Sequence, residues 1–396
     1  MQVTVRQGDS LWFYNQLFQV PIQLLIDSNR GINQDQLMVG QRIHIPGFVL
    51  SDYKIKRGDT FWSIARRNNL QPDALTLANP TVNPQTLQVG QSINLPTRVT
   101  WRVVNGKEKY DYNKLREDIR ELIAIYPFII QESVGNSVMG KRIDELRIGN
   151  GSKRVHVNGS FHANEWITTP IIMKFLNDYL LGLTNSGSMA NIDLNQLYQS
   201  TMLSSVPMVN PDGVNLVLNG PPQAEPYRSN VLEINNGSTD FSNWKANIRG
   251  VDLNNQFPAR WEIEKERKEQ EPAPRDYPGP YPLSEPEAQA MADLTYQRDF
   301  YSVNAFHTQG RVIYWGFENQ EPPLAEAIVR EYANVSGYQP IKSVDSYAGY
   351  KDWFIQEWER PGYTIELGSG NNPLPLSQFN EIYRAARPIL LASLYM

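Results

Sequence analysis

Residues 154–165 read Arg154-Val155-His156-Val157-Asn158-Gly159-Ser160-Phe161-His162-Ala163-Asn164-Glu165. Valine alternates with other residues in the first part of this segment, which predicts a strand over 154–160, and the apolar periodicity of residues 166–181 predicts a helix. Residues 112–126 give a second helix pattern, and residues 143–148 give a second strand pattern. Strands and helices that alternate along a chain are typical of an α/β sheet, so we expect a mixed α/β domain from Thr97 onward.

One long segment does not fit this alternation. Residues 262–271 form a charged run, and residues 272–286 are rich in proline. Proline removes a backbone donor and disrupts helices and strands, so we expect a surface loop over 262–286.

The composition indicates two or three folded units. The chain has 396 residues, against ~150 for a typical domain, and its 41% apolar and 20% charged residues support packed cores. No apolar run approaches the ~18 residues of a membrane helix. The absence of cysteine excludes disulfides, thiolate ligands and a cysteine nucleophile, which leaves catalytic or metal chemistry to His, Asp, Glu, Ser or Lys.

Charge is distributed unevenly along the chain. Residues 1–96 contain 8 Lys and Arg against 6 Asp, whereas the first Glu is Glu108, and the net charge of the whole chain is −5. This change in composition marks a domain boundary near residue 97. Neither part has a strongly basic surface, so we expect no nucleic-acid partner. The first residues lack a basic segment followed by an apolar core, so we expect no secretory signal peptide.

An internal repeat organises the beginning of the chain. A shift of 50 residues aligns Val3–Pro46 with Tyr53–Pro96 without a gap, and Val39-Gly40-Gln41 coincides with Val89-Gly90-Gln91. Each copy shows a strand pattern, a Gly-Asp turn, two short helix patterns and a closing strand pattern. We therefore predict three domains, at residues 1–47, 51–97 and 98–396.

The repeat resembles the lysin motif (LysM), a small β-α-α-β module that binds N-acetylglucosamine-containing glycans of bacterial walls and spore coats. The Gly-Asp-Ser/Thr turn and the Leu-x-Val-Gly-Gln-x-Ile ending carry the resemblance, although copy one has Arg30 where copy two has Pro80. We expect Trp12 and Trp62 in the module cores. The resemblance implies glycan contacts from two loops of each module, with candidates at Gly8, Asp9, Ser10, Gly58, Asp59, Thr60, Asn79 and Pro80.

Histidines provide the most informative catalytic candidates. His162 and Glu165 lie three residues apart where a strand ends and a helix begins, so both side chains can face one point. His307 follows another apolar strand, at residues 301–306, and strand ends are where the sites of α/β sheets collect. Together the three would supply the ligands of a catalytic zinc with an open position for water. His156 competes for this role, but it lies in mid-strand and is expected to be structural.

Glu366 is the candidate for the base that such a zinc site needs. It lies in a strand pattern, residues 363–367, that Gly368 closes. An inward-facing carboxylate is costly in such a strand unless it has a function. The alternative is that Glu366 pairs with a neighbouring cation.

From about residue 100 the chain resembles the zinc carboxypeptidase (carboxypeptidase A-like) family. The motifs that carry the resemblance follow in the family's order: Gly159…His162-x-x-Glu165, Val209-Asn210-Pro211-Asp212-Gly213, Trp244-Lys245-Ala246-Asn247, Gly250-Val251-Asp252-Leu253-Asn254, Ser284-Glu285-Pro286-Glu287, His307, Asp352-Trp353 and Glu366. The resemblance implies a mixed eight-stranded sheet flanked by helices. It also implies one zinc ion per chain held by His162, Glu165 and His307, with Glu366 as general base.

Departures from the family pattern bear on the substrate. Digestive carboxypeptidases hold a terminal carboxylate with an Asn-Arg pair, whereas this chain has Asn254-Asn255, so the bidentate clamp is missing. Lys245 stands where the family has an arginine that polarises the scissile carbonyl, and Arg249 is a candidate for either function. Tyr347 and Tyr350 are the candidates for the family's mobile catalytic tyrosine.

A peptidase domain fused to two LysM modules resembles the γ-D-glutamyl-L-diamino acid endopeptidases of sporulating bacilli. The resemblance implies hydrolysis of the γ-D-glutamyl bond to diaminopimelate or lysine in peptidoglycan stem peptides, with LysM modules that concentrate the enzyme on its polymer. The alternatives are an ordinary metallocarboxypeptidase and a peptidoglycan- or chitin-binding protein with an inactive peptidase domain. We expect cytoplasmic synthesis with action at the cell wall or spore cortex, and the sequence leaves the diamino acid and the oligomeric state open.

Overall fold

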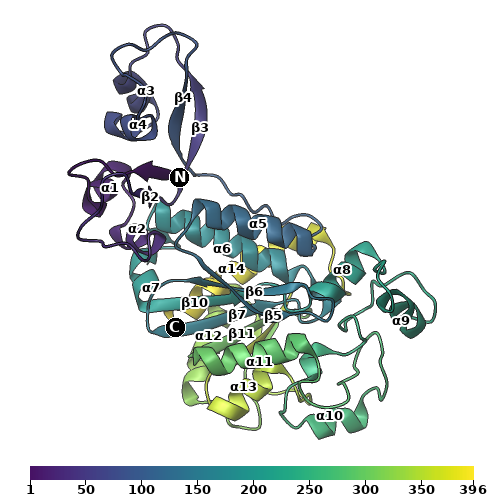
Figure 1. Ribbon diagram of the computed structural model, residues 1–396. Helices are drawn as coiled ribbons and strands as arrows, with labels where there is room; N and C mark the ends of the chain where they lie inside the picture. Colours follow the sequence, from purple (N-terminus) through teal and green to yellow (C-terminus); the bar gives the residue numbers. More distant parts are fainter. The chain divides into compact units, whose positions relative to one another are not determined.

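The computed structural model describes residues 1–396, which pack as two compact units (Figure 1). The first unit comprises Met1–Val103, Asp118–Ile129 and Asn177–Asn195. The second comprises Val104–Glu117, Ile130–Leu176 and Gln196–Met396. None of the helices has both the length and the hydropathy that a membrane span requires. Both repeat copies belong to the first unit, and all the catalytic candidates belong to the second.

Each repeat copy folds as the predicted β-α-α-β module. The elements are β1 Gln2–Thr4, α1 Leu11–Phe18, α2 Ile22–Ser28 and β2 Arg42–His44, then β3 Phe48–Lys54, α3 Phe61–Arg67, α4 Pro72–Ala78 and β4 Ser92–Arg98. The two strands of each module pair antiparallel. Ser10 caps α1 by accepting a hydrogen bond from Phe13 N at 3.1 Å, and Thr60 caps α3 by accepting one from Ser63 N at 3.0 Å.

The expectation that Trp12 and Trp62 lie in the module cores is wrong. Trp12 is 68% exposed and Trp62 is 59% exposed. Helix α1 buries Leu11 and Tyr14, and each residue of a helix is rotated by about 100° from the one before it, so Trp12 points away from the buried face. Both indole rings therefore lie on the surfaces of their modules.

The second unit is built on the mixed eight-stranded sheet that the family resemblance implied. Its strands are β5 Ile130–Asn136, β6 Arg142–Ile148, β7 Lys153–Gly159, β10 Thr201–Val206, β11 Ser302–Thr308, β12 Val312–Tyr314, β13 Gln339–Ile341 and β14 Gly362–Leu367. They lie in the order β13-β12-β14-β11-β7-β10-β6-β5. The four central strands β14, β11, β7 and β10 are parallel, and an antiparallel strand flanks them on either side.

The parallel strands place the catalytic candidates at one edge of the sheet. In the pairing of β11 with β14, His307 lies opposite Glu366. Side chains alternate between the faces of a strand, so aligned residues of parallel neighbours share a face. The segment that follows β7 carries His162 and Glu165 to the same edge, because β7 runs parallel to β11 beside it.

Helices cover both faces of this sheet (Figure 1). The helices after the modules are α5 Tyr112–Ile125, α6 Thr168–Thr184, α7 Leu194–Ser200, α8 Pro211–Asn219, α9 Tyr227–Ile234, α10 Trp261–Arg267, α11 Pro286–Arg298, α12 Pro323–Ser336, α13 Tyr350–Trp358 and α14 Phe379–Tyr395, and a short hairpin pairs β8 Ser188–Met189 with β9 Ile192–Asp193. Helix α14 packs on α12 and β10, whereas α13 packs on β11 and β14. Residues of α11 and α13 share one hydrophobic core with β11.

The expected surface loop over residues 262–286 is wrong in its first part. Residues Trp261–Arg267 form α10, in which Trp261 and Glu264 are buried. Glu264 accepts a hydrogen bond from Tyr347 N, and Arg267 pairs with Asp345 at 2.9 Å, so tertiary partners stabilise a helix inside the charged run. The rest of the expected loop, residues 268–285, has neither helix nor strand, and Pro286 begins α11.

The neighbours Phe61 and Trp62 provide a test of this core assignment. Phe61 is 4% exposed and Trp62 is 59% exposed. We expect Phe61→Ala to lower the free energy of opening of the second module by about 3 kcal/mol, the scale of a buried aromatic truncation. Trp62→Ala should change it by no more than about 0.5 kcal/mol. Hydrogen exchange of the β3 and β4 amides measures both, and a larger loss for Trp62→Ala would contradict the assignment.

Candidate active site

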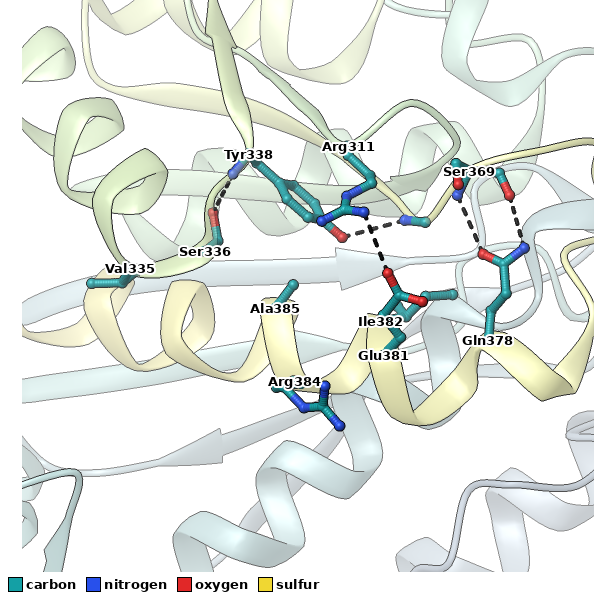
Figure 2. A pocket seen from close by; sticks show the side chains of 11 residues that line it. Arg311, Val335, Ser336, Tyr338, Ser369, Gln378, Glu381, Ile382, Arg384 and Ala385 are labelled. Atoms are coloured by element: carbon teal, nitrogen blue, oxygen red, sulfur yellow. Dashed lines mark hydrogen bonds and ion pairs between the residues drawn. The ribbon is translucent and has the colours of Figure 1, made fainter.

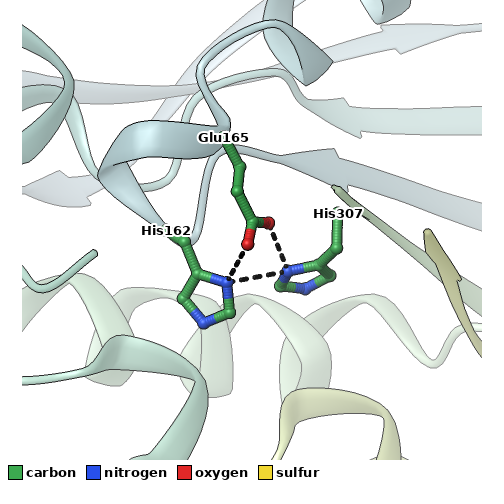
Figure 3. Close-up of side chains that lie close together, drawn as sticks. All are labelled: His162, Glu165 and His307. Carbon is green, nitrogen blue, oxygen red and sulfur yellow. Dashed lines mark hydrogen bonds and ion pairs between the residues drawn. The ribbon is translucent and has the colours of Figure 1, made fainter. Parts of the chain in front are cut away.

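Three buried side chains meet at the carboxyl edge of the sheet (Figure 3). His162 Nδ1 lies 2.9 Å from Glu165 Oε1, His307 Nδ1 lies 3.0 Å from Glu165 Oε2, and the two Nδ1 atoms are 3.1 Å apart. A short 3-10 turn, Ala163–Glu165, directs the carboxylate back toward His162. Two imidazole nitrogens that face one carboxylate in this way form a donor set for a divalent cation.

Asp252 orients His162, one member of this cluster. Its Oδ1 lies 3.2 Å from His162 Nε2, and its Oδ2 lies 3.0 Å from Lys245 Nζ. A hydrogen bond from Nε2 to the carboxylate places the proton of His162 on Nε2 and leaves the lone pair of Nδ1 toward Glu165. Glu165 is held in turn by the backbone N–H of Thr308, at 3.1 Å from Oε2. The sequence motif contained Asp252 but gave no sign of this role.

The charges of the cluster shift the pKa values of its members. Burial opposes the charged form of His162, but the carboxylates of Glu165 and Asp252 outweigh it and raise the pKa of His162. Burial likewise opposes the charged form of Asp252, but Lys245 and His162 hold its pKa well below the usual range. Burial lowers the pKa of His307. His307 is therefore neutral at pH 7, which is the form that binds a metal.

Glu366 and Lys245 line the same hollow as the cluster. This larger hollow has a volume of about 530 Å³, and its lining includes His162, Glu165, Lys245, Arg275, Tyr314 and Glu366. Burial and the negative charge of Glu165 raise the pKa of Glu366, against the opposing effect of His162 and Lys245. A carboxyl with a raised pKa can both take up and release a proton near neutral pH.

A smaller hollow, of about 220 Å³, adjoins the larger one. The two share His162, Lys245, Tyr314 and Glu366 in their linings. The smaller hollow is also lined by Asn254, Asn255, Lys268, Val344, Ser346, Gly349, Lys351, Asp352 and Thr364. The four shared residues therefore mark the place where a bond could be cut, with the two parts of a substrate in the two hollows.

Arg275, rather than Arg249, is the guanidinium beside the cluster. Arg249 pairs with Glu285 at 3.5 Å and lines neither hollow, whereas Arg275 lines the larger one. The carbonyl of Pro274 accepts a hydrogen bond from Lys245 N at 2.8 Å, which fixes the proline-rich loop beside the site. Sequence reasoning missed Arg275 because this loop has no periodic pattern and no family motif.

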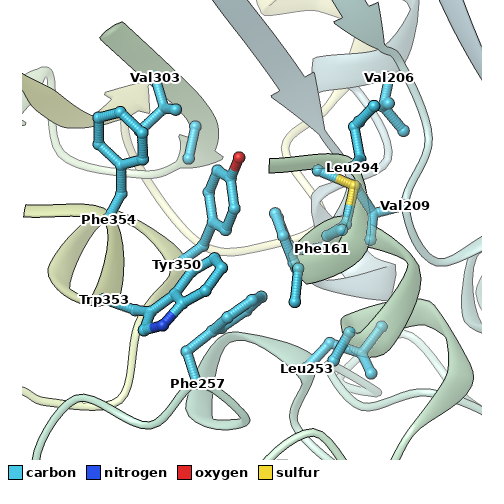
Figure 4. Packing of buried hydrophobic residues seen from close by; sticks show 14 of the residues in the cluster. Phe161, Val206, Val209, Leu253, Phe257, Leu294, Val303, Tyr350, Trp353 and Phe354 are labelled. Carbon is cyan, nitrogen blue, oxygen red and sulfur yellow. The ribbon is translucent and has the colours of Figure 1, made fainter. Parts of the chain in front are cut away.

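Tyr314 is the tyrosine that lines both hollows. The two sequence candidates do not. Tyr350 is fully buried in the hydrophobic core of Figure 4, with its hydroxyl 2.8 Å from Thr295 Oγ1, and Tyr347 packs against the edge of the same core. Glu366 lines both hollows as well, and burial and the charge of Glu366 raise the pKa of Tyr314. Its position at the end of a three-residue strand left no signal in the sequence.

The candidate glycan residues lie at the module loops, but several of their side chains have internal partners. Asp9 accepts a hydrogen bond from Tyr14 Oη, and Asp59 accepts one from Tyr53 Oη, both at 2.8 Å. Asn79 is buried, and its amide bridges α4 to β4 through backbone groups. Ser10 and Thr60 are the helix caps described above. The exposed candidates at these loops are Gly8, Gly58, Thr60 and Pro80.

A third hollow, of about 330 Å³, shares no lining residue with the other two (Figure 2). Arg311 pairs there with Glu381 at 3.3 Å. Gln378 Nε2 donates to the carbonyl of Ser369 at 2.8 Å. These polar groups are partners of one another, and the third hollow does not extend the metal cluster.

The fold and the cluster define a zinc peptidase, and comparison with known proteins agrees. The family model for zinc carboxypeptidases matches residues 115–388, and the LysM domain model matches residues 3–46 and 53–96. The chain therefore belongs to the zinc carboxypeptidase family, and it carries two LysM modules.

Similar proteins match all of the chain or about three quarters of it. This chain is 63% identical to gamma-D-glutamyl-L-diamino acid endopeptidase 1 of Lysinibacillus sphaericus. The match extends over 396 residues and covers 100% of both chains. This chain is also 44% identical to the uncharacterized protein YqgT of Bacillus subtilis (strain 168). That match extends over 290 residues and covers 72% of this chain and 77% of YqgT. The structure of bovine thrombin-activatable fibrinolysis inhibitor, in complex with tick carboxypeptidase inhibitor, matches with a TM-score of 0.57 and 17% identity, over 73% of this chain and 97% of that chain. This last likeness supports the fold alone.

Zinc, the cofactor of the chain, fits the residues of the cluster. His162, Glu165 and His307 offer two imidazole nitrogens and one carboxylate, which is a ligand set of catalytic zinc sites. Asp252 supplies the outer carboxylate that such a histidine ligand commonly has.

Replacement of Asp252 tests this arrangement. We expect Asp252→Asn to weaken zinc binding by about 10- to 100-fold, because the amide cannot hold His162 in its ligand tautomer as the carboxylate does. Competition with a chelator measures the affinity of the full chain. Asp276→Asn is the control, since Asp276 lies 3.7 Å from Lys245 and has no contact with His162. Equal affinity of Asp252→Asn and the unaltered protein would contradict the role of Asp252.

Proposed function

We propose that the chain hydrolyses the γ-D-glutamyl bond to the diamino acid in peptidoglycan stem peptides. The observation that carries this proposal is the 63% identity, over the full length of both chains, to a protein named gamma-D-glutamyl-L-diamino acid endopeptidase 1. The buried cluster of His162, Glu165 and His307, with Glu366 beside it, favours an active peptidase over a wall-binding protein with an inactive domain.

In this proposal His162, Glu165 and His307 would hold the zinc ion, which when bound would act as a Lewis acid for the scissile carbonyl and lower the pKa of water. Glu366 accepts the proton of the attacking water and later gives it to the leaving amine. Its raised pKa suits both steps. Lys245, fixed by Asp252 at 3.0 Å, holds a positive charge beside the oxyanion that develops on the carbonyl oxygen.

We assign each of the two hollows to one side of the scissile bond. Asn254 and Asn255 stand where related carboxypeptidases hold the terminal carboxylate, so we assign the smaller hollow to the amine side of the bond. The larger hollow then receives the D-glutamate. Asn255 cannot form the bidentate clamp of an arginine, so the smaller hollow does not select a chain end. This disfavours an ordinary carboxypeptidase.

We assign the free α-carboxylate of the D-glutamate to Arg275. The sequence candidates for this role were Arg249 and Lys245, but Arg249 lines neither hollow and Lys245 is engaged by Asp252. The side chain of Arg275 is 58% exposed and its only charged partner is its neighbour Asp276, at 3.0 Å. Its planar fork can therefore turn toward a carboxylate and bind it through two hydrogen bonds.

The modules, residues 1–47 and 51–97, would bind N-acetylglucosamine-containing glycan and bring the catalytic domain, residues 98–396, to the cell wall or spore cortex. The exposed loop residues Gly8, Gly58 and Pro80 support glycan contacts at the predicted loops. The exposed rings of Trp12 and Trp62 add apolar surfaces on which a sugar can stack. Two weak sites on one chain raise the local concentration of the peptidase at its polymer.

Parallel digestion of two substrates tests the proposed reaction. We expect the full chain to release L-Ala-γ-D-Glu from an L-Ala-γ-D-Glu-diaminopimelate stem and to leave a blocked dipeptide with a free C-terminal aromatic residue nearly intact. Mass spectrometry identifies the products. Glu366→Gln should lower kcat on the stem by about 10²- to 10⁴-fold with unchanged zinc content, because an amide cannot accept the proton of water. A comparable kcat/KM on the dipeptide would establish an ordinary carboxypeptidase instead.

The assignment of Arg275 predicts that its replacement lowers activity selectively on stems with a free D-glutamate α-carboxylate. Arg275→Gln should lower kcat/KM on the D-glutamate stem by about tenfold or more, the scale of a charge-assisted hydrogen bond. It should have little effect on a stem whose α-carboxylate is amidated. Arg249→Gln is the matched control and should behave like the unaltered enzyme on both stems. The opposite result, a selective loss in Arg249→Gln alone, would transfer the role to Arg249.

A further inference from the structure

An irregular segment, residues 244–252, carries two of the residues that the proposed mechanism uses. Lys245 lies near its beginning and Asp252 at its end, and Lys245 Nζ lies 3.0 Å from Asp252 Oδ2. The segment contains neither helix nor strand. The hydrogen bonds of a regular element therefore cannot hold the two side chains together, and other contacts must fix the path of the chain between them.

Neighbouring backbone groups hold both ends of this segment. Lys245 O accepts a hydrogen bond from Ala163 N at 3.0 Å. At the other end, Asp252 N donates to Tyr277 O at 2.8 Å, and Asp252 Oδ1 accepts a hydrogen bond from Asn254 N at 3.1 Å. These bonds fix the segment at its two ends, but they do not fix the turn between Lys245 and Asp252.

Asn247, which is fully buried, closes that turn. Its Oδ1 accepts hydrogen bonds from Arg249 N at 2.9 Å and from Val251 N at 3.1 Å. Its backbone N donates to Val251 O at 2.8 Å, and its backbone O accepts a hydrogen bond from Gly250 N at 3.1 Å. These four hydrogen bonds fix the conformation of the chain directly before Asp252.

The amide nitrogen of Asn247 ties the turn to the start of α11. Nδ2 donates to Glu285 Oε2 at 2.7 Å and to Glu287 Oε2 at 3.3 Å, and both of these carboxyl groups are buried. Their other oxygens have partners of their own, since Glu285 Oε1 accepts a hydrogen bond from Ser284 Oγ at 3.2 Å and Glu287 Oε1 accepts one from Val138 N at 3.0 Å. All four hydrogen-bonding positions of the Asn247 amide are therefore occupied.

Asparagine satisfies both sides of this contact. The carboxyl groups of Glu285 and Glu287 need a donor, whereas the two backbone N–H groups of the turn need an acceptor. Aspartate offers acceptors only, so it could satisfy one side but not the other. Burial and the charges of Asp212 and Glu285 raise the pKa of Glu287 to about 7, although the N–H of Val138 opposes them. A further carboxylate at position 247 would therefore meet carboxyl groups that already repel one another.

We propose that Asn247 is a positioning residue of the active site. Because it closes the turn before Asp252, it sets the direction in which that carboxylate points. Asp252 in turn contacts His162 Nε2 and Lys245 Nζ. Asn247 lines none of the hollows described above, so it acts through Asp252 rather than on the substrate. The effect on His162 concerns zinc binding alone, whereas the effect on Lys245 rests on the proposed function.

Asn247→Asp replaces the amide nitrogen by an oxygen and keeps the shape of the side chain. We expect it to weaken zinc binding by about tenfold, the lower end of the range for groups that orient a metal ligand, because Glu285 and Glu287 would repel the new carboxylate and open the turn. On the L-Ala-γ-D-Glu-diaminopimelate stem, kcat should fall by about ten- to hundredfold with little change in KM. Competition with a chelator measures the zinc affinity of the full chain, and kinetics of the zinc-saturated enzyme measure kcat and KM.

Asn247→Asp combined with Glu285→Gln reverses donor and acceptor across the 2.7 Å bond. The amide introduced at position 285 can donate to the carboxylate introduced at position 247, and the number of buried carboxyl groups returns to that of the unaltered protein. We expect this double variant to regain most of the zinc affinity and most of kcat. Glu285→Gln alone should resemble the unaltered protein, because its amide oxygen can still accept from Asn247 Nδ2 and the lost partner Arg249, at 3.5 Å, is half exposed.

Asn304→Asp is the matched control for a general loss of stability. Asn304 is fully buried in β11, its Nδ2 donates to His156 O at 3.1 Å, and its Oδ1 accepts a hydrogen bond from Tyr332 Oη at 3.0 Å. None of these side-chain hydrogen bonds reaches Asp252 or a zinc ligand. We expect Asn304→Asp to lower the unfolding temperature as Asn247→Asp does, but to leave zinc affinity and kcat unchanged.

Gly250→Ala strains the same turn without a change of charge. Gly250 has a φ of +75°, and a Cβ at this position would lie 3.0 Å from Ala273 N. We expect a severalfold loss of zinc affinity, so this variant tests the role of the turn even if Asn247→Asp does not fold.

Unchanged zinc affinity and kcat in both Asn247→Asp and Gly250→Ala would overturn the role of Asn247. An equal loss of zinc affinity in Asn304→Asp would also overturn it, because the effect would then follow from lower stability alone. Failure of the unaltered chain to cleave the stem would overturn the proposed function, and the zinc affinities would still test Asn247.

Discussion

The catalytic site depends on one buried carboxylate. Asp252 lies with one oxygen 3.2 Å from His162 Nε2 and with the other 3.0 Å from Lys245 Nζ. It can hold both only while it is charged, and the two positive partners keep its pKa low although burial acts against the charge. Under the proposed function, the same side chain therefore sets both the tautomer of a metal ligand, His162, and the position of the cation, Lys245, that would stabilise the oxyanion.

Strands carry the part of the site that could be predicted from the sequence. His307 and Glu366 were placed at the ends of apolar strand patterns, and the sheet pairs these two residues across β11 and β14. A strand alternates strictly between two faces, so a residue's position in the pattern fixes the direction of its side chain. The LysM modules were predictable for a related reason, because a repeat of 50 residues without a gap constrains both copies at once.

Loops and short helices carry the part that could not be predicted. Arg275 lines the larger hollow from a loop that the hydrogen bond from Lys245 N to Pro274 O holds in place. Such a bond produces no periodic pattern in the sequence, so it could not be predicted. Helix α1 contains apolar residues on more than one side, so tertiary packing rather than hydropathy selects Leu11 for the core and leaves Trp12 exposed. The helix within the charged run has the same origin, since its stability depends on distant partners.

Asn255 is the residue by which the smaller hollow differs from a carboxypeptidase site. An arginine clamp on a terminal carboxylate binds a feature that every peptide chain has at its end, so it makes the enzyme cut there. An enzyme that cuts inside a stem peptide of a polymer cannot depend on that feature. With asparagine at position 255, the smaller hollow has a neutral and buried amide donor in place of that clamp. Under the proposed function, the smaller hollow therefore does not select a chain end. The affinity that the clamp would have supplied must then come from elsewhere, and two glycan-binding modules on the same chain are a physical means to supply it.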